Sequence, residues 1–313
     1  VKYIEFVLRA SITTKEIFDY RSEFNNLVKF NYGKHQKSLY LLNAKQLCSR
    51  GAYKEGIQIF DETYKNLLEA DKEKWFFGRS VINYGDSMML KGNFKSALLA
   101  YEKYSKASNE CWNINNNFDE SRQRAHTFRF NADWEQAKIL YEQLLDAYNF
   151  SDNLKSYALV GICETLCYTN ADYVIDNYES IVQLCNNIMN QKSAAKVYYA
   201  AGISYTVKKE FGNAKQCIDT SITLNQDASY PSGVLFALIA KCYLEYAQSK
   251  TITPATIRRI ETLLGKMQVY EFLKLPIYII MDSKEQIENC EHKFEWLDFE
   301  KTYLNINNFL KLL

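Results

Sequence analysis

Three side chains able to bind charge or transfer protons recur at helical spacing in the middle of the chain. Arg122, His126 and Arg129 are four and three residues apart, which places them on one face of a helix. A guanidinium group forms paired hydrogen bonds with a carboxylate or a phosphate. The spacing therefore favours a surface that binds an acidic group. The alternative is a solvated helix face whose charges keep the protein soluble.

The sequence contains no pattern that is typical of an enzyme active site. It has no GxSxG nucleophile turn, and neither GxxxxGK[ST] nor GxGxxG for nucleotide phosphates. Cys163 and Cys167 are one helical turn apart, but no second pair follows and the three histidines are far apart in sequence. We therefore predict a non-enzymatic protein without a metal or cofactor, in which the cysteines are small core residues.

Composition argues against several classes of partner. The 313 residues carry 38 Lys and Arg against 37 Asp and Glu, so no overall field attracts nucleic acid or a membrane surface. No recognised nucleic-acid motif is present, and no run of about 18 apolar residues could span a membrane. Eight cysteines without a CxxC pair and without a signal peptide favour reduced thiols, so we expect a cytoplasmic protein.

Helix breakers are scarce, which predicts long helices joined by short turns. Only 3 Pro and 11 Gly occur in the chain. The clearest unit is Ser80–Lys106, where the spacing of apolar residues predicts two amphipathic helices around a turn at Gly92.

Small and aromatic residues of this unit recur elsewhere at nearly constant offsets. Five positions lie 41 residues after similar residues of an earlier copy: Gly85 after Ala44, Gly92 after Gly51, Phe94 after Tyr53, Ala97 after Gly56 and Tyr101 after Phe60. A third copy starts near Ala125, and others start near Gly161, Gly202 and Gly233, although the copy at Gly161 lacks a clear small residue in its second helix. Small residues let two helices approach closely, and a single hairpin cannot bury its apolar face alone. The chain is therefore predicted to stack helical hairpins.

This pattern resembles the tetratricopeptide repeat family. The match lies in the small residue of each first helix, the Gly and aromatic residue at the turn, and the small residue of each second helix. The resemblance covers about residues 37–245 and implies an all-α, right-handed solenoid of about six hairpins. We expect an N-terminal helical extension at 1–36, the solenoid at 37–260 and a C-terminal helical cap at 261–313. The repeats span 36 to 41 residues, against about 34 in the family.

In the tetratricopeptide family the first helices line a concave groove that holds a peptide. The resemblance maps this groove onto ten residues: Lys45, Arg79, Asp86, Arg122, His126, Arg129, Lys155, Lys196, Tyr199 and Lys241. Seven of the ten are Lys or Arg and one is acidic. We therefore expect the ligand to be an acidic peptide, a C-terminal carboxylate or a phosphorylated segment.

The aromatic stretch FEWLDF near the end of the chain allows two interpretations. Phe294, Trp296 and Phe299 either cover the core at the end of the solenoid or form a surface for dimerisation or partner docking. We expect the last helical segment to cover the last hairpin, after a break at Pro276.

The sequence therefore predicts a non-enzymatic scaffold that recognises a protein or peptide partner, with homo-oligomerisation left open. The alternative is a regulatory or sensor module cut from a larger protein, because lengthened repeats look similar to those of bacterial signalling ATPases and peptide-responsive regulators. The start of the chain at Val1 leaves both interpretations open. An enzyme with an unrecognised site is the third.

Overall fold

The computed structural model describes residues 75–108 and 114–313, together with scattered positions between 40 and 63. In this part of the chain thirteen α-helices and one short 3-10 helix follow one another, with a single isolated β-bridge. The α-helices are α6 (Trp75–Lys91), α7 (Phe94–Ser108), α8 (Ile114–Phe130), α9 (Trp134–Tyr148), α10 (Asp152–Leu166), α11 (Ala171–Asn187), α12 (Gln191–Val207), α13 (Phe211–Asp227), α14 (Pro231–Ser249), α15 (Pro254–Met267), α16 (Leu275–Ile280), α17 (Lys284–Lys293) and α18 (Phe299–Leu312).

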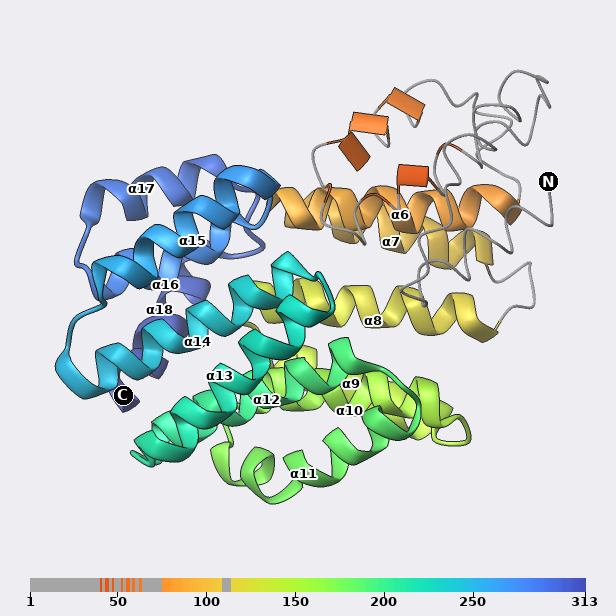
Figure 1. Ribbon diagram of the computed structural model, residues 1–313. Helices are drawn as coiled ribbons and strands as arrows, with labels where there is room; N and C mark the ends of the chain where they lie inside the picture. The colour runs from red at the N-terminus through yellow and green to blue at the C-terminus, as the bar shows by residue number, and fades with distance from the viewer. Residues whose placement is uncertain are drawn as a thin grey trace.

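Successive helices pack as hairpins, and the hairpins stack into a curved array (Figure 1). The pairs are α6/α7, α8/α9, α10/α11, α12/α13 and α14/α15, so the predicted all-α solenoid is confirmed. The array curves so far that Tyr270, after α15, donates its backbone N–H to Leu90 O at the end of α6, at 2.9 Å. The predicted first hairpin (residues 38–66) lies almost entirely outside the described residues, and the extension at 1–36 lies wholly outside them.

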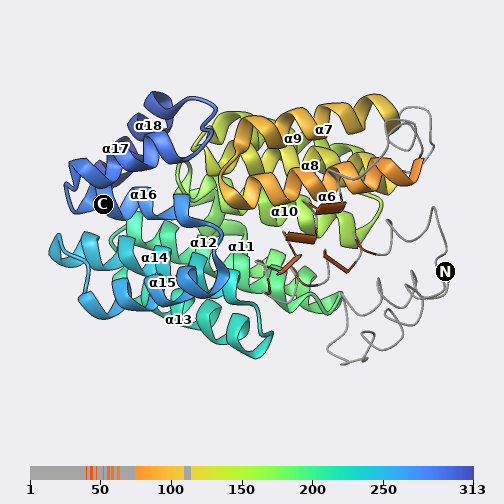
Figure 2. The same ribbon diagram turned by 90° about the horizontal axis from the view of Figure 1, so that it is seen from above.

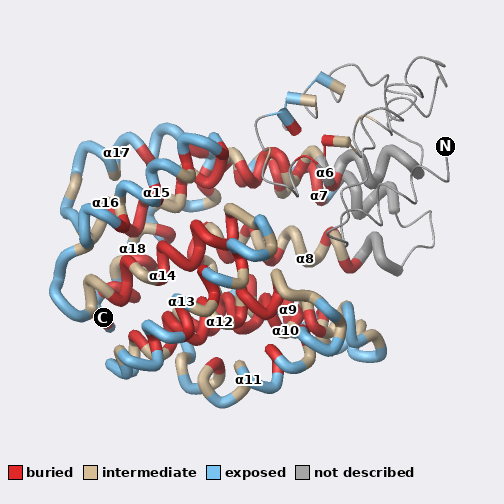
Figure 3. The backbone as a smooth tube through the Cα atoms, in the orientation of Figure 1, coloured by how far each residue is buried: buried red, intermediate tan, exposed pale blue. Residues whose placement is uncertain are grey.

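The helices that come first in each pair form the centre of the structure. The first helices α8, α10, α12 and α14 contact one another along the array. Figure 3 shows that buried residues concentrate on α10, α12 and α14. Side chains of the first helices therefore form the centre of the core and line the inner side of the array.

Glycine occurs where two helices of the array approach most closely. A Cβ atom on Gly85 would lie 2.4 Å from Tyr101 Cε1, and one on Gly161 would lie 2.2 Å from Tyr141 Cε1. Both tyrosines are fully buried. The expected reason for small residues in the first helices is therefore confirmed, because the missing side chain makes room for a tyrosine of a neighbouring helix.

The fourth hairpin, α10/α11, departs from the repeat pattern at the start of its second helix, where the positions of the small and the large side chain are exchanged. The helices α7, α9 and α13 begin with an aromatic residue and carry Ala three residues later. In α11 the first residue is Ala171, and Val174 stands at the later position with no exposed surface. In α11 the larger side chain therefore stands at the later position and the smaller one at the first. This explains why the small-residue pattern is lost in this copy.

The second helix of the last hairpin, α15, continues to Met267 and so crosses position 260, where the solenoid is expected to end. The division of the chain into domains stays a prediction. A 3-10 helix (Glu271–Lys274) follows, and Pro276 lies in the first turn of α16, where its missing N–H costs no hydrogen bond.

The segment from Phe294 to the last residue packs along the turns of several hairpins (Figure 2). Glu295 N donates to Gly92 O at 3.0 Å, and Leu297 N donates to Asn131 Oδ1 at 2.9 Å. The Lys209 ammonium donates to the backbone carbonyl of Leu312 at 3.1 Å. The sequence predicts that this segment covers the last hairpin, and in the structure its contacts extend to earlier hairpins as well. The segment joins the turns of α6/α7, α8/α9 and α12/α13, because the array curves back on itself.

The aromatic stretch lies in the core. The Trp296 ring is 4% exposed and lies 5.4 Å from the Phe94 ring between centroids, and the Phe294 ring lies 6.2 Å from that of Phe272. Trp296 Nε1 donates to Cys290 O at 2.8 Å. Phe299 is half-buried against Trp296. The core interpretation therefore describes Phe294 and Trp296, and these two rings offer no exposed docking surface.

Candidate functional site

The structure places the predicted groove residues on five first helices. Asp86 lies on α6, Arg122, His126 and Arg129 on α8, Lys155 on α10, Lys196 and Tyr199 on α12, and Lys241 on α14. Lys45 lies outside the described residues, and of Arg79 only the backbone in α6 is described. Six of these side chains are partly exposed: Asp86, Arg122, His126, Lys155, Lys196 and Lys241. We call the surface formed by the first five, which lie on α6, α8, α10 and α12, the inner face.

A buried ionic cluster lies beneath the inner face and joins three successive hairpins. Arg129 Nη1 on α8 lies 3.2 Å from Glu164 Oε1 on α10, and their side chains are 6% and 0% exposed. The Tyr199 hydroxyl on α12 donates to the same Glu164 oxygen and accepts from Arg129 Nη1 at 3.2 Å. Lys196 Nζ lies 3.7 Å from the other oxygen, Glu164 Oε2. Two cations therefore surround one buried carboxylate.

The cluster keeps Glu164 ionised. Burial alone would raise the pKa of this carboxyl group. The nearby Arg129 and Lys196 cations, helped by the Tyr199 hydrogen bond, outweigh burial and lower the pKa below its ordinary value. The charge of Arg129 is therefore balanced by Glu164 within the protein, and this ion pair holds α8 against α10.

His126 is neutral at pH 7. Its pKa lies well below the ordinary value because the ring is buried and because Arg129, Lys196 and Arg122 are nearby. Its Nδ1 atom lies 2.7 Å from the Tyr141 hydroxyl and 3.4 Å from Arg129 Nη2. An arginine only donates, so Nδ1 accepts and the ring proton is assigned to Nε2. His126 therefore contributes polar contacts but no charge to the inner face.

The other end of the inner face carries an acid and a shielded arginine. Asp86 accepts from the Tyr101 hydroxyl at 2.9 Å and from Gln123 Nε2 at 3.3 Å. Arg122 Nη2 lies 3.1 Å from Asp119 Oδ1, and its guanidinium carbon lies 4.9 Å from the Tyr157 ring centroid. These contacts fix the positions of the α8 side chains, and they balance much of the Arg122 charge within the protein.

Beyond the cluster, toward α14, the array is closed by its own side chains. The rings of Phe130 and Phe236 stack with their centroids 6.0 Å apart, although two hairpins, α10/α11 and α12/α13, separate them in the chain. Tyr270 and Phe272 pack against Phe130 at 6.0 and 5.3 Å. Lys241 on α14 is held 3.8 Å from Glu245 on the same helix. The five inner-face residues therefore lie on α6, α8, α10 and the start of α12, whereas the partly exposed Lys241 on α14 is paired with Glu245.

Sequence reasoning missed three residues that organise the site: Glu164, Tyr141 and Gln123. Glu164 could have been found, because it is the only charged residue in the run 158–167, which is apolar apart from Glu164 and Thr165. A lone acid in such a run signals a buried, paired carboxylate. The hydrogen bond between Tyr141 and His126 depends on the packing of α9 and has no signal in the sequence.

The described cysteines are core thiols. Six of them are free and buried, and burial raises the pKa of Cys163 to about 12. Among the described residues no group of three His, Cys, Asp or Glu side chains could hold a metal ion. Within the same part of the chain, every helix is too short or too polar to cross a membrane.

Comparison with known proteins agrees with an all-helical repeat fold. No protein-family model and no curated protein matches the sequence. Among solved structures, 17 chains match in fold. One is the crystal structure of a Rap protein complexed with Competence and Sporulation Factor, with a TM-score of 0.62 and 10% sequence identity over 99% of this chain and 90% of that chain. At this identity the likeness shows the fold, a curved array of sequential helix pairs.

Proposed function

We propose that this protein is a non-enzymatic recognition scaffold that binds a peptide segment of a partner on the inner face. Partly exposed polar side chains from four helices converge there, which suits the recognition of an extended ligand through several separate contacts. The resemblance to the tetratricopeptide repeat family supports the same surface. The Rap protein structure, which is similar in fold, holds a bound factor.

We propose further that the ligand carries a carboxylate or phosphate. The observation that carries this proposal is the surplus of positive charge around Glu164, where Arg129 and Lys196 share one carboxylate. Glu164 Oε2 accepts no hydrogen bond from any described residue, so the Lys196 ammonium, 19% exposed, remains available to a second acidic group. Lys155, one of the five inner-face residues, is half-buried and has no ion pair with a described residue. Lys155 and Lys196 are therefore the proposed anchors, and Glu164, which Arg129 holds, lies 3.7 Å from the Lys196 ammonium.

Selection from a library of random heptapeptides on the 313-residue chain tests this proposal. We expect the selected peptides to be rich in Asp and Glu, and Lys196→Gln or Lys155→Glu to weaken their binding about tenfold, a loss of about 1.4 kcal/mol. Lys284→Glu, an exposed change at the start of α17, is the control and keeps full affinity. Peptides without acidic residues, or equal affinity for all three variants, would contradict the proposal.

A second candidate function is a regulatory module whose shape responds to the ligand. The observation that favours it is the C-terminal segment, which is bonded to the turns of three hairpins and so links their relative positions. A selected peptide should then change the radius of gyration measured by small-angle X-ray scattering. An unchanged radius at saturating peptide would favour a rigid scaffold.

A further inference from the structure

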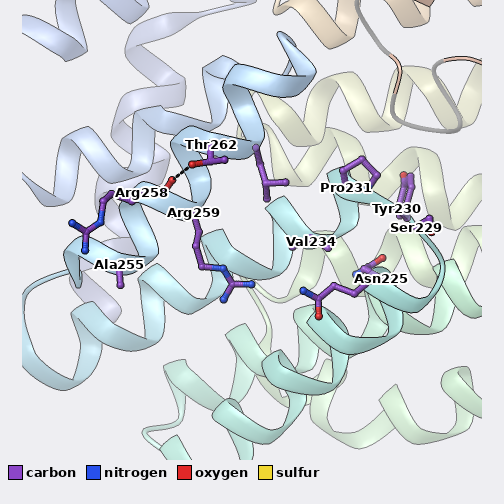
Figure 4. Close-up of a pocket in the computed structure, with 11 residues that line it drawn as sticks. Asn225, Ser229, Tyr230, Pro231, Val234, Ala255, Arg258, Arg259 and Thr262 are labelled. Atoms are coloured by element: carbon purple, nitrogen blue, oxygen red, sulfur yellow. Dashed lines mark hydrogen bonds between the residues drawn. The ribbon is translucent and has the colours of Figure 1, made fainter.

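A groove lies apart from the inner face, between the second helices α13 and α15 and the first turn of α14 (Figure 4). Its volume is about 640 Å³. Its apolar lining residues are Tyr230, Pro231, Val234, Ala255 and Leu263. A concavity of this size holds a few residues of a peptide or a small molecule.

The two charged residues that line the groove are both arginines. Arg258 and Arg259 on α15 line it, are exposed and make no ion pair with a described residue. Lys192 lies at the neighbouring end, with its ammonium 4.9 Å from the centre of the Tyr230 ring. None of the eleven lining residues is acidic. The groove therefore pairs an apolar floor with cations that no described carboxylate neutralises.

The two arginines do not occupy equivalent positions. In Figure 4 the Arg259 side chain extends from α15 in the direction of α13, whereas the Arg258 guanidinium points away. Thr262 donates its hydroxyl to Arg258 O at 2.8 Å, a bond within α15. Arg259 is thus the cation placed to meet a ligand that lies on Val234 and Leu263. Because a guanidinium binds a carboxylate through two parallel hydrogen bonds, it selects for acids.

We propose that this groove docks a short segment of a partner protein in which an apolar side chain is followed by a carboxylate. The apolar side chain covers Val234 and Leu263, and the carboxylate pairs with Arg259. The argument is one of charge complementarity between an uncompensated basic rim and an acidic segment. It does not depend on the proposed function of the inner face, because none of the inner-face residues lines the groove.

Methyl-resolved NMR spectroscopy of the full chain tests the proposal, with the methyl groups of Val234 and Leu263 as reporters. The probe is N-acetyl-leucyl-glutamic acid amide, which has one isobutyl group and one carboxylate. Its charge-reversed partner is N-acetyl-leucyl-lysine amide. We expect both methyl resonances to shift with the acidic dipeptide and the lysine dipeptide to bind at least fivefold more weakly. That is the size of effect expected for one exposed ion pair.

The variant Arg259→Glu should abolish the preference for the acidic dipeptide, and Lys284→Glu, far from the groove in sequence, should leave it unchanged. Equal shifts with both dipeptides, or no shift with either, would overturn the proposal. Hexanoate is the third probe. Shifts as large as those of the acidic dipeptide would assign the groove to small amphiphilic acids and would overturn its assignment to a protein segment.

Discussion

The arginine of the buried cluster and those of the groove show how burial decides what a cation does. Arg129 is 94% buried in terms of its side chain, and Glu164 neutralises it. Arg259 belongs to the same residue type, but it is exposed and makes no ion pair with a described residue. The first arginine ties helices together, whereas the second is available to a partner. A basic residue on the face of a repeat is therefore a candidate for ligand binding only if no carboxylate of the protein itself pairs with it.

Removing the internal carboxylate should have the largest effect on this contrast. Glu164→Leu leaves Arg129 buried without a counter-charge, and we expect the free energy of unfolding to fall by about 3–5 kcal/mol. Urea denaturation followed by circular dichroism measures the change. In the double variant Arg129→Met/Glu164→Leu the buried charge is gone, so most of the loss should be recovered, because Lys196 can turn to solvent. If both variants are equally destabilised, packing and not charge holds the cluster.

The glycine that precedes Glu164 on α10 tests the packing beneath the cluster. Gly161→Ala forces the buried Tyr141 ring to move, and we expect a loss of about 1–3 kcal/mol in the free energy of unfolding. Gly265 on α15 has no atom within 4 Å of an added Cβ, so Gly265→Ala should stabilise the protein by up to about 1 kcal/mol. Thermal denaturation of the two variants should therefore move the midpoint in opposite directions. A stabilised Gly161→Ala would contradict the tight contact with Tyr141.

The neutral histidine of the inner face predicts a pH dependence. The pKa of His126 is lowered well below its ordinary value of 6.5 in the folded protein, so below that pH the unfolded chain binds the proton more readily. Above pH 6.5 the ring is neutral in both states and does not affect the free energy of unfolding. Below pH 6.5 protonation of the unfolded chain lowers the free energy of unfolding. We expect a decline of up to about 1.4 kcal/mol per pH unit between pH 6.5 and 5. His126→Gln should remove this slope, and the exposed-site control His292→Gln should keep it. The slope is read from urea denaturation at each pH.

The exposed arginine of the groove should have the smallest effect on stability. Arg259→Glu breaks no hydrogen bond or ion pair with a described residue, so the free energy of unfolding should change by less than about 0.5 kcal/mol. The measurement is the same urea denaturation as for Glu164→Leu. A loss comparable to that of Glu164→Leu would show that Arg259 has a structural role, and the contrast between the two arginines would then fail.

Sequence reasoning located the helices because their signals are local. Gly85, Gly161 and Ala137 mark contacts between helices, and spacing alone is enough to find them. It did not predict the contacts of the C-terminal segment with the earlier hairpin turns, because those contacts depend on the curvature of the whole array. Spacing does not reveal that Leu297 reaches Asn131, since the two residues meet only when the whole array bends.

The candidate site was predictable in part. The helical face that carries Arg122, His126 and Arg129 follows from the sequence, and the structure places Lys196 and Tyr199 beside it. The charge state of that face did not follow, because Glu164 and Tyr141 come from other helices. The groove lined by Arg259 was not anticipated, since its lining residues become neighbours only through the packing of α13, α14 and α15.

A double-mutant cycle between Lys196 and the acidic residue of a selected peptide tests the central claim most directly. Calorimetric titration gives four affinities, for the wild-type chain and Lys196→Gln with the peptide and its Glu→Gln counterpart. A direct contact predicts that the two changes are not additive, with an interaction energy of at least about 0.5 kcal/mol. Additive losses would show that Lys196 does not meet the ligand carboxylate, and the proposed inner-face site would then be contradicted.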